Sequence, residues 1–208
     1  MQASTIYQQI LSNDPMDVLT LKRQICLAKV TGSREITIKL LNEFLTVFQN
    51  DTEAWMELAE LYLEANIYQY AAHCFEELIL LHPQNYHYYV KYGEVLYTIG
   101  GHDNLLLAGK QFSFSLELST KNNNSAWWGL ILVAHAVLSS KHSSAKDAKT
   151  YSELFQLASS QISQIYQSKN HSKLYIVSKT LEKLNPPVPK HPNPVSSNLP
   201  KPHQSKIH

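Results

Sequence analysis

The sequence predicts an all-α fold: a solenoid of stacked antiparallel helix pairs, followed by C-terminal helices and a disordered proline-rich tail. Residues 52–85 have the internal spacing of a 34-residue helix–turn–helix unit, and the same period recurs before and after them. The 208-residue chain contains only six glycines, and no alternating apolar run is long enough to form a sheet. Because one helix pair cannot bury its apolar face alone, such units must stack on their neighbours.

The best-formed unit, residues 52–85, matches the tetratricopeptide repeat. A large aromatic residue opens its first helix, and a small residue, Ala59, lets the second helix approach closely. Ala71 and Phe75 then fill the space between the two helices, and Pro83 stops the second helix. The matching positions, which we expect to form the repeat core, are Trp55, Leu58, Ala59, Tyr62, Tyr68, Ala71, Phe75 and Pro83.

Neighbouring units extend the pattern in both directions. Residues 86–121 form the next repeat, whose expected core residues are Tyr89, Gly93, Ala108 and Phe112. Its second helix lies three residues later than the period requires, and a turn beginning with Gly100 and Gly101 takes up that length. Before residue 52, a weaker repeat covers about 18–50, and residues 3–14 read as the second helix of a repeat in which the chain begins.

The C-terminal part contains further helices and then changes composition. A helix begins near Ala126, an amphipathic helix covers residues 143–167, and a last one covers 174–184. Residues 185–208 hold seven of the nine prolines and no acidic residue. We therefore predict a helical domain over residues 1–184 and a disordered tail over 185–208.

Composition excludes several functional classes. Eighteen basic and 17 acidic side chains give a net charge of +1, so the sequence predicts no nucleic-acid partner. No signal peptide is visible, and the longest apolar run, residues 126–138, is too short to span a bilayer. The two cysteines, Cys26 and Cys74, lie at helical repeat positions and are expected to be buried thiols rather than a disulfide.

The sequence offers no catalytic, metal-binding or cofactor-binding motif, and we predict no enzymatic activity. No histidine pair has the spacing of a zinc-binding helix. His73 and Cys74 are adjacent on a helix and point about 100° apart, which argues against an activated thiolate. The Ser-x-x-Lys spacing of residues 143–146 is better explained by a serine that caps the following helix.

The first helices of such repeats line a concave surface that commonly holds another protein. Stepping along them gives a possible partner-binding groove, with ordinary packing between repeats as the alternative for each residue. Its residues are Met56, Glu60, Leu63, Val90, Glu94, Tyr97 and Trp128. Met56 and Glu60 stand where a chaperone-tail clamp needs basic and amide side chains, so that function is disfavoured.

Two further surface features have alternative interpretations. The first-helix carboxylates Glu53, Glu57, Glu60 and Glu64 form either a solvated face or a contact surface for a basic partner. Tyr86 and Tyr88 are expected to be exposed, in contrast to Tyr89 and Tyr92 in the core.

Several segments resemble the family of subunit 2 of the endoplasmic reticulum membrane protein complex, over about residues 3–184. The glycine-containing insertion is the most specific of them, because generic repeats lack it. The resembling segments are residues 42–45, 51–62, 71–78, 94–101, 104–108 and 158–162. The chain departs from the family at both ends, since members begin further upstream and lack such a tail.

The resemblance implies a non-enzymatic cytosolic scaffold, peripheral on the cytoplasmic face of the endoplasmic reticulum membrane, with a cytosolic pool. Such a subunit binds the cytosolic parts of the complex's membrane subunits and a second soluble subunit. The whole complex inserts tail-anchored and multispanning proteins. The alternative is a free adaptor that binds peptides through its groove, or proline-helix readers through residues 186–192.

Overall fold

The computed structural model describes residues 2–140 and 144–185, and within these ranges all regular secondary structure is helical. The all-α tetratricopeptide-type fold predicted from the sequence is confirmed. Apart from Asn185, the predicted tail lies outside the described residues. The helices are α1 (Gln2–Asn13), α2 (Val18–Val30), α3 (Arg34–Val47), α4 (Thr52–Glu64), α5 (Tyr68–Leu81), α6 (Tyr86–Ile99), α7 (His102–Leu118), α8 (Asn124–Ser139), α9 (Ala145–Lys169), the short 3-10 helix η1 (His171–Lys173) and α10 (Leu174–Leu184).

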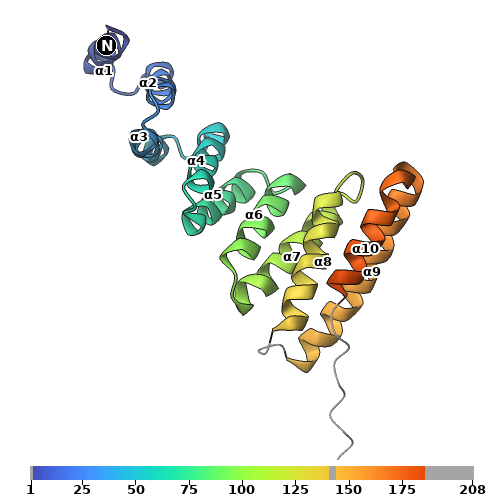
Figure 1. Ribbon diagram of the computed structural model, residues 1–208. Helices are drawn as coiled ribbons and strands as arrows, with labels where there is room; N and C mark the ends of the chain where they lie inside the picture. The colour runs from blue at the N-terminus through green and yellow to red at the C-terminus, as the bar shows by residue number, and fades with distance from the viewer. Residues whose placement is uncertain (1, 141–143, 186–208) are drawn as a thin grey trace, which may run out of the picture.

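Successive helices pack against one another in chain order, so that the array runs from α1 at one end to α9 and α10 at the other (Figure 1). The first helices of the pairs are α2, α4, α6 and α8, and the second helices are α3, α5, α7 and α9. Among the described helices, α8 also packs against two helices that are not its neighbours in the chain order, α6 and α10. The contact between α6 and α8 brings two first helices together.

The 34-residue period is visible in the polar residues that start the first helices. Asp17, Asp51 and Asn85 lie one period apart, and each accepts a hydrogen bond from a backbone N–H two or three residues further on. This satisfies one of the unpaired donors at the start of α2, α4 and α6. The spacing of the caps fixes where each repeat begins.

A second periodic feature ends these helices. Gly32, Asn66 and Gly100 also lie one period apart, and all three adopt positive φ angles of 79°, 59° and 74°. Glycine and asparagine tolerate this left-handed conformation, which reverses the chain between the two helices of a pair. In the third pair Gly101 has a φ of 85° as well. The expectation that the glycine turn takes up the extra length is wrong, because α7 begins at His102, one period after α5 begins at Tyr68. The extra residues lie inside α7, which has 17 residues where α3 and α5 have 14. Ala108 and Phe112 therefore come three residues late within a helix that starts on the period.

The packing of Phe112 explains why two glycines lie on the facing helices. Its ring is 1% exposed, and it lies between Gly93 of α6 and Gly129 of α8. A Cβ atom would come within 2.9 Å of the ring at Gly93 and within 2.5 Å at Gly129. The absence of side chains at both positions therefore lets α6, α7 and α8 close around one aromatic ring.

Two expectations about burial were wrong. Cys26 is exposed, whereas Cys74 is buried as predicted. Cys26 follows Ile25, which carries the buried face of α2, and adjacent helix residues point in different directions. Tyr88 is buried and Tyr86 half-buried, because α6 is covered by neighbours on more than one side.

Candidate partner-binding surface

The predicted groove residues all lie on the first helices α4, α6 and α8. Two hollows open between these helices, one between α4 and α6 and one between α6 and α8. Glu60, Glu94 and Trp128 lie one repeat period apart, so equivalent positions of three repeats contribute to the same surface. The repeat thus determines where a partner can contact this surface.

We call the space between α4 and α6 the acidic hollow. It measures about 420 Å³, and Met56 and Glu60 of the predicted groove line it. Lys29 of α2 and Tyr88 of α6 complete its walls. The other lining residues are Thr52, Glu53 and Glu57. Three carboxylates around one aromatic residue suit a segment that carries both basic and apolar side chains.

We call the space between α6 and α8 the aromatic hollow. It measures about 350 Å³, and it brings together Glu94, Tyr97 and Trp128 of the predicted groove. Phe112 and Gly129 also line this hollow. Gly129 has no side chain, so it leaves space both for the Phe112 ring and for the hollow. The remaining lining residues are Thr98, Ser125 and Leu132.

Two of the predicted groove residues line neither hollow. Val90 is only 5% exposed, so it supplies packing between repeats rather than an accessible surface. Leu63 is half-buried near the end of α4. For these two positions, the alternative of ordinary packing describes the structure better.

Basic residues of the preceding pair neutralise most of the acidic stripe on α4. Lys22 lies 3.3 Å from Glu53, Lys29 lies 2.7 Å from Glu57, and Arg34 lies 3.5 Å from Glu64. The hydrogen bond with Glu57 raises the pKa of Lys29 despite partial desolvation. The stripe is therefore largely a contact between repeats within the chain. Glu60 makes no ion pair within residues 2–140 and 144–185, which leaves its charge available in the acidic hollow.

Glu94, one period later, has a different environment. Its carboxylate lies 2.9 Å from the Lys91 ammonium on the same helix, and both side chains are largely exposed. Exposed pairs at this spacing contribute little free energy, because solvent screens them. A competing basic group can therefore displace Lys91 at low cost.

The expected repeat core divides into buried and half-buried residues. Leu58, Ala59, Ala71, Phe75, Tyr89, Gly93, Ala108 and Phe112 are buried. Trp55 and Tyr62 are half-buried, and each places its polar atom in a hydrogen bond: the Trp55 indole N–H donates to the Gln49 carbonyl, and the Tyr62 hydroxyl accepts from Asn42. Pro83 is exposed in the turn after α5, and its carbonyl accepts from the Tyr89 hydroxyl at 3.0 Å.

The surroundings of Cys74 disfavour an activated thiolate at this position. Burial raises the pKa of Cys74 to about 12, so the thiol stays protonated at neutral pH. Ser144 caps α9 by accepting from the Asp147 N–H, as expected for a helix start. Within the described ranges, no three His, Cys, Asp or Glu side chains are placed to hold a metal ion. Nor does this part of the chain contain a helix long and apolar enough to cross a membrane.

Sequence reasoning missed Tyr88, Thr98, Ser125, Gly129 and Leu132 as lining residues of the hollows. Gly129 had a usable signal, since a glycine inside a helix usually marks a close approach. The others had none, because a hollow between two repeats depends on side chains that are about 30 residues apart in the chain.

Comparison with known proteins identifies a matching family and similar relatives. The family described as EMC2 TPR-like repeat domain matches residues 1–111. The ER membrane protein complex subunit 2-B of Xenopus laevis is 44% identical over 167 residues, which is 79% of this chain and 55% of that protein. Subunit 2-A of the same species is 42% identical over 165 residues, with the same coverage of 79% and 55%. The chain thus spans about half the length of these relatives.

A solved structure supports the fold independently. A tetratricopeptide repeat protein from Parabacteroides merdae has a TM-score of 0.59 at 14% identity, covering 86% of this chain and 64% of its own. At that identity the likeness concerns the fold alone.

Proposed function

Because the chain belongs to the family of ER membrane protein complex subunit 2, we propose that it is a non-enzymatic scaffold of that complex, positioned on the cytoplasmic face of the endoplasmic reticulum membrane. The observation that supports this most directly is the pair of hollows on α4, α6 and α8. They offer one continuous run of first helices with acidic and aromatic side chains.

The proposed partners are cytosolic parts of the complex's membrane subunits and a second soluble subunit. The hollows suit a partner segment with basic side chains near Glu60 and Glu94 and an apolar side chain near Trp128. The repeat spacing would hold such segments at a fixed separation. In this way a rigid array contributes to insertion of tail-anchored and multispanning proteins by positioning other subunits.

The test is native affinity purification of the tagged full chain after gentle solubilisation, followed by quantitative mass spectrometry. We expect the other subunits of the complex to be recovered. Glu60→Lys and Glu94→Lys together should reduce recovery several-fold, because they place positive charge in both hollows. Glu117→Lys is the matched control, since Glu117 is exposed on the second helix α7 and lines neither hollow.

Recovery of chaperones and degradation factors alone would contradict the proposed membership. Equal recovery with the double variant and the Glu117 control would place the contacts elsewhere on the chain. The free-adaptor alternative is tested by deleting residues 185–208: an adaptor that works through its prolines loses its partners, whereas a scaffold keeps them.

A further inference from the structure

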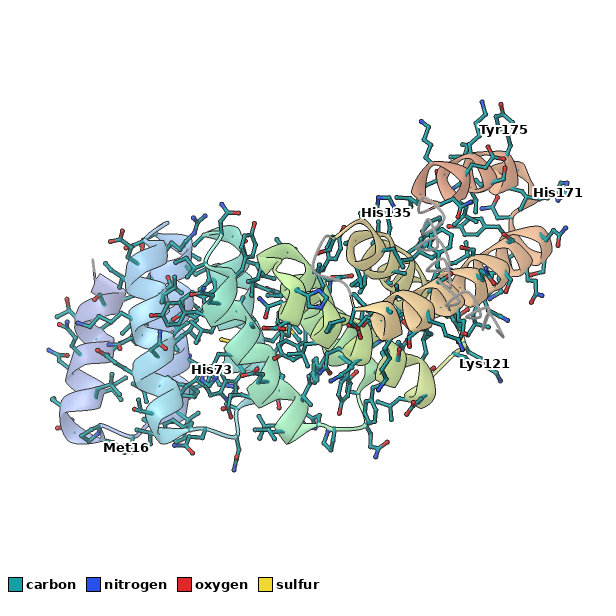
Figure 2. All side chains as sticks on the ribbon, turned by 90° about the horizontal axis from the view of Figure 1, so that it is seen from below. Met16, His73, Lys121, His135, His171 and Tyr175 are labelled. Atoms are coloured by element: carbon teal, nitrogen blue, oxygen red, sulfur yellow. The ribbon has the colours of Figure 1, made fainter. Side chains whose placement is uncertain are left out.

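The C-terminal end of α10 is hydrogen-bonded to α8, one of the two helices that border the aromatic hollow. The Nδ1–H of His135, on α8, donates a hydrogen bond to the carbonyl of Leu184, the last residue of α10, over 2.8 Å. His135 is labelled in Figure 2, on the helix that borders the end of α10. The direction of this bond is fixed, because a carbonyl can only accept. Residue 185 therefore leaves the helical array at α8.

That exit point lies close to Trp128 along the same helix face. His135 follows Trp128 by seven residues, which corresponds to about 10.5 Å along the axis and a rotation of only about 20°. Leu132 lies between them and lines the hollow. The chain beyond α10 thus starts about two helical turns from the mouth of the aromatic hollow.

The residues that follow have the chemistry that this hollow would bind. They read Pro186-Pro187-Val188-Pro189-Lys190, and 185–208 contains no acidic residue. An extended proline helix rises about 3.1 Å per residue, so four residues cover about 12 Å and reach Trp128. Proline-rich segments of this kind dock on grooves lined by aromatic side chains, here Tyr97 and Trp128. Lys190 could then compete with Lys91 for the Glu94 carboxylate.

We propose that residues 186–190 bind in cis to the aromatic hollow of their own chain and compete there with a partner segment. Short connections create effective concentrations in the millimolar range. A segment that binds in trans with a Kd of only about 100 µM would therefore occupy the hollow about ten times as often as it leaves it free. The docking does not depend on membership of the complex, but its regulatory consequence rests on the proposed function.

The first experiment is intramolecular photocrosslinking in the full chain. A photoreactive p-benzoylphenylalanine replaces Val188, and the monomer is irradiated at low concentration and mapped by mass spectrometry. We expect crosslinks to residues 94–98 or 125–132. Glu94→Lys should reduce their yield about fivefold, because it replaces attraction of Lys190 by repulsion. Glu60→Lys is the matched control, since it makes the same change one repeat earlier and should leave the yield unaltered.

A second measurement uses a fluorescent peptide of residues 185–192 as the probe. Its affinity for the full chain is compared with its affinity for a full chain that carries Pro186→Ser, Pro187→Ser and Pro189→Ser. Removing the internal competitor should tighten binding about tenfold. Equal affinities, crosslinks confined to α9 and α10, or crosslinks that form only between molecules would overturn the proposal. Loss of the membrane-complex partners with these crosslinks intact would instead contradict the proposed function alone.

Discussion

At the scale of single residues, Asp51 connects the start of a helix to the preceding repeat. Its carboxylate accepts from the Ala54 N–H at 2.9 Å and lies 2.7 Å from the Lys22 ammonium of α2. Burial alone would raise the pKa of Asp51, but the bonds from Lys22 and Ala54 outweigh it and hold the pKa below its ordinary value. The charged form of Asp51 is therefore the one that stabilises the fold.

We expect Asp51→Ala to lower the free energy of unfolding at pH 7 by about 1 kcal/mol, the usual cost of losing a helix cap. A carboxyl with a lowered folded-state pKa stabilises above its unfolded pKa of about 3.9 and loses that contribution as the pH falls through the folded value. The difference between wild type and variant should therefore shrink below about pH 4. Urea unfolding of both proteins at pH 7 and pH 3.5 measures the difference in their free energies of unfolding. A difference that stays constant with pH would contradict this account.

The two thiols should differ in reactivity. Burial holds the Cys74 thiol protonated, with a pKa of about 12, whereas Cys26 is exposed. In native protein at pH 8, a thiol reagent should modify one cysteine per chain and reach the second only after denaturation. Cys26→Ser should abolish the native reaction, and Cys74→Ser should leave it unchanged. Two equally fast reactions in the native protein would contradict the burial of Cys74.

At the scale of helices, the Phe112 ring of α7 packs between Gly93 of α6 and Gly129 of α8. Gly129→Ala would normally stabilise a helix interior by about 1 kcal/mol through propensity. Here the added methyl meets the Phe112 ring at 2.5 Å, and the ring is fully enclosed. We expect a net loss of about 1–3 kcal/mol from overpacking. Thermal and urea unfolding measure it, with Ser139→Ala on the exposed end of α8 as the control.

A second substitution, at Phe112, tests whether the clash with the ring causes this loss of stability. If the clash with the ring is the cause, Phe112→Leu should cost less in the Gly129→Ala background than in wild type. Such coupling is what residues in direct contact show. Additive effects, or a gain in stability from Gly129→Ala alone, would mean that the ring has room to move.

Helix positions could be predicted because their signals are local and periodic. The spacing of Trp55, Ala59 and Ala71 located one repeat. The three extra residues of the next repeat were expected in the Gly100-Gly101 turn, but they lengthen α7 instead. Burial of Tyr88 and exposure of Cys26 could not be predicted in the same way. They depend on which neighbouring helix covers a given face, and the period alone does not contain that information.

The candidate surface shows the same division between local and non-local information. Glu60, Glu94 and Trp128 were predicted as surface positions because they recur with the repeat, and they line the two hollows. Val90 lies one period after Met56, which lines the acidic hollow, but Val90 is buried because α6 contacts α5, α7 and α8. A hollow exists only where two repeats leave space between their side chains, and that depends on packing.

At the scale of the whole molecule, each helix pair contacts only its neighbours, so stability should vary along the array. None of the described side chains of α1 is buried, whereas seven residues of α8 are. Between these extremes, ion pairs connect Lys22, Lys29 and Arg34 to α4, but these pairs are largely exposed and add little stability. Burial, and with it resistance to opening, is greatest around α6, α7 and α8.

Hydrogen exchange measured by mass spectrometry should reveal this gradient. We expect amides of α1 to exchange at least about a hundredfold faster than those of α8, because a frayed terminal helix opens at almost no cost while α8 opens only with its neighbours. Exchange in α10, whose one buried residue is Val177, should be intermediate. Rates are normalised to the denatured chain, so that sequence-dependent chemistry is removed. Equal protection of α1 and α8 would mean that the array unfolds as one cooperative unit, and the nearest-neighbour description of its stability would then be wrong.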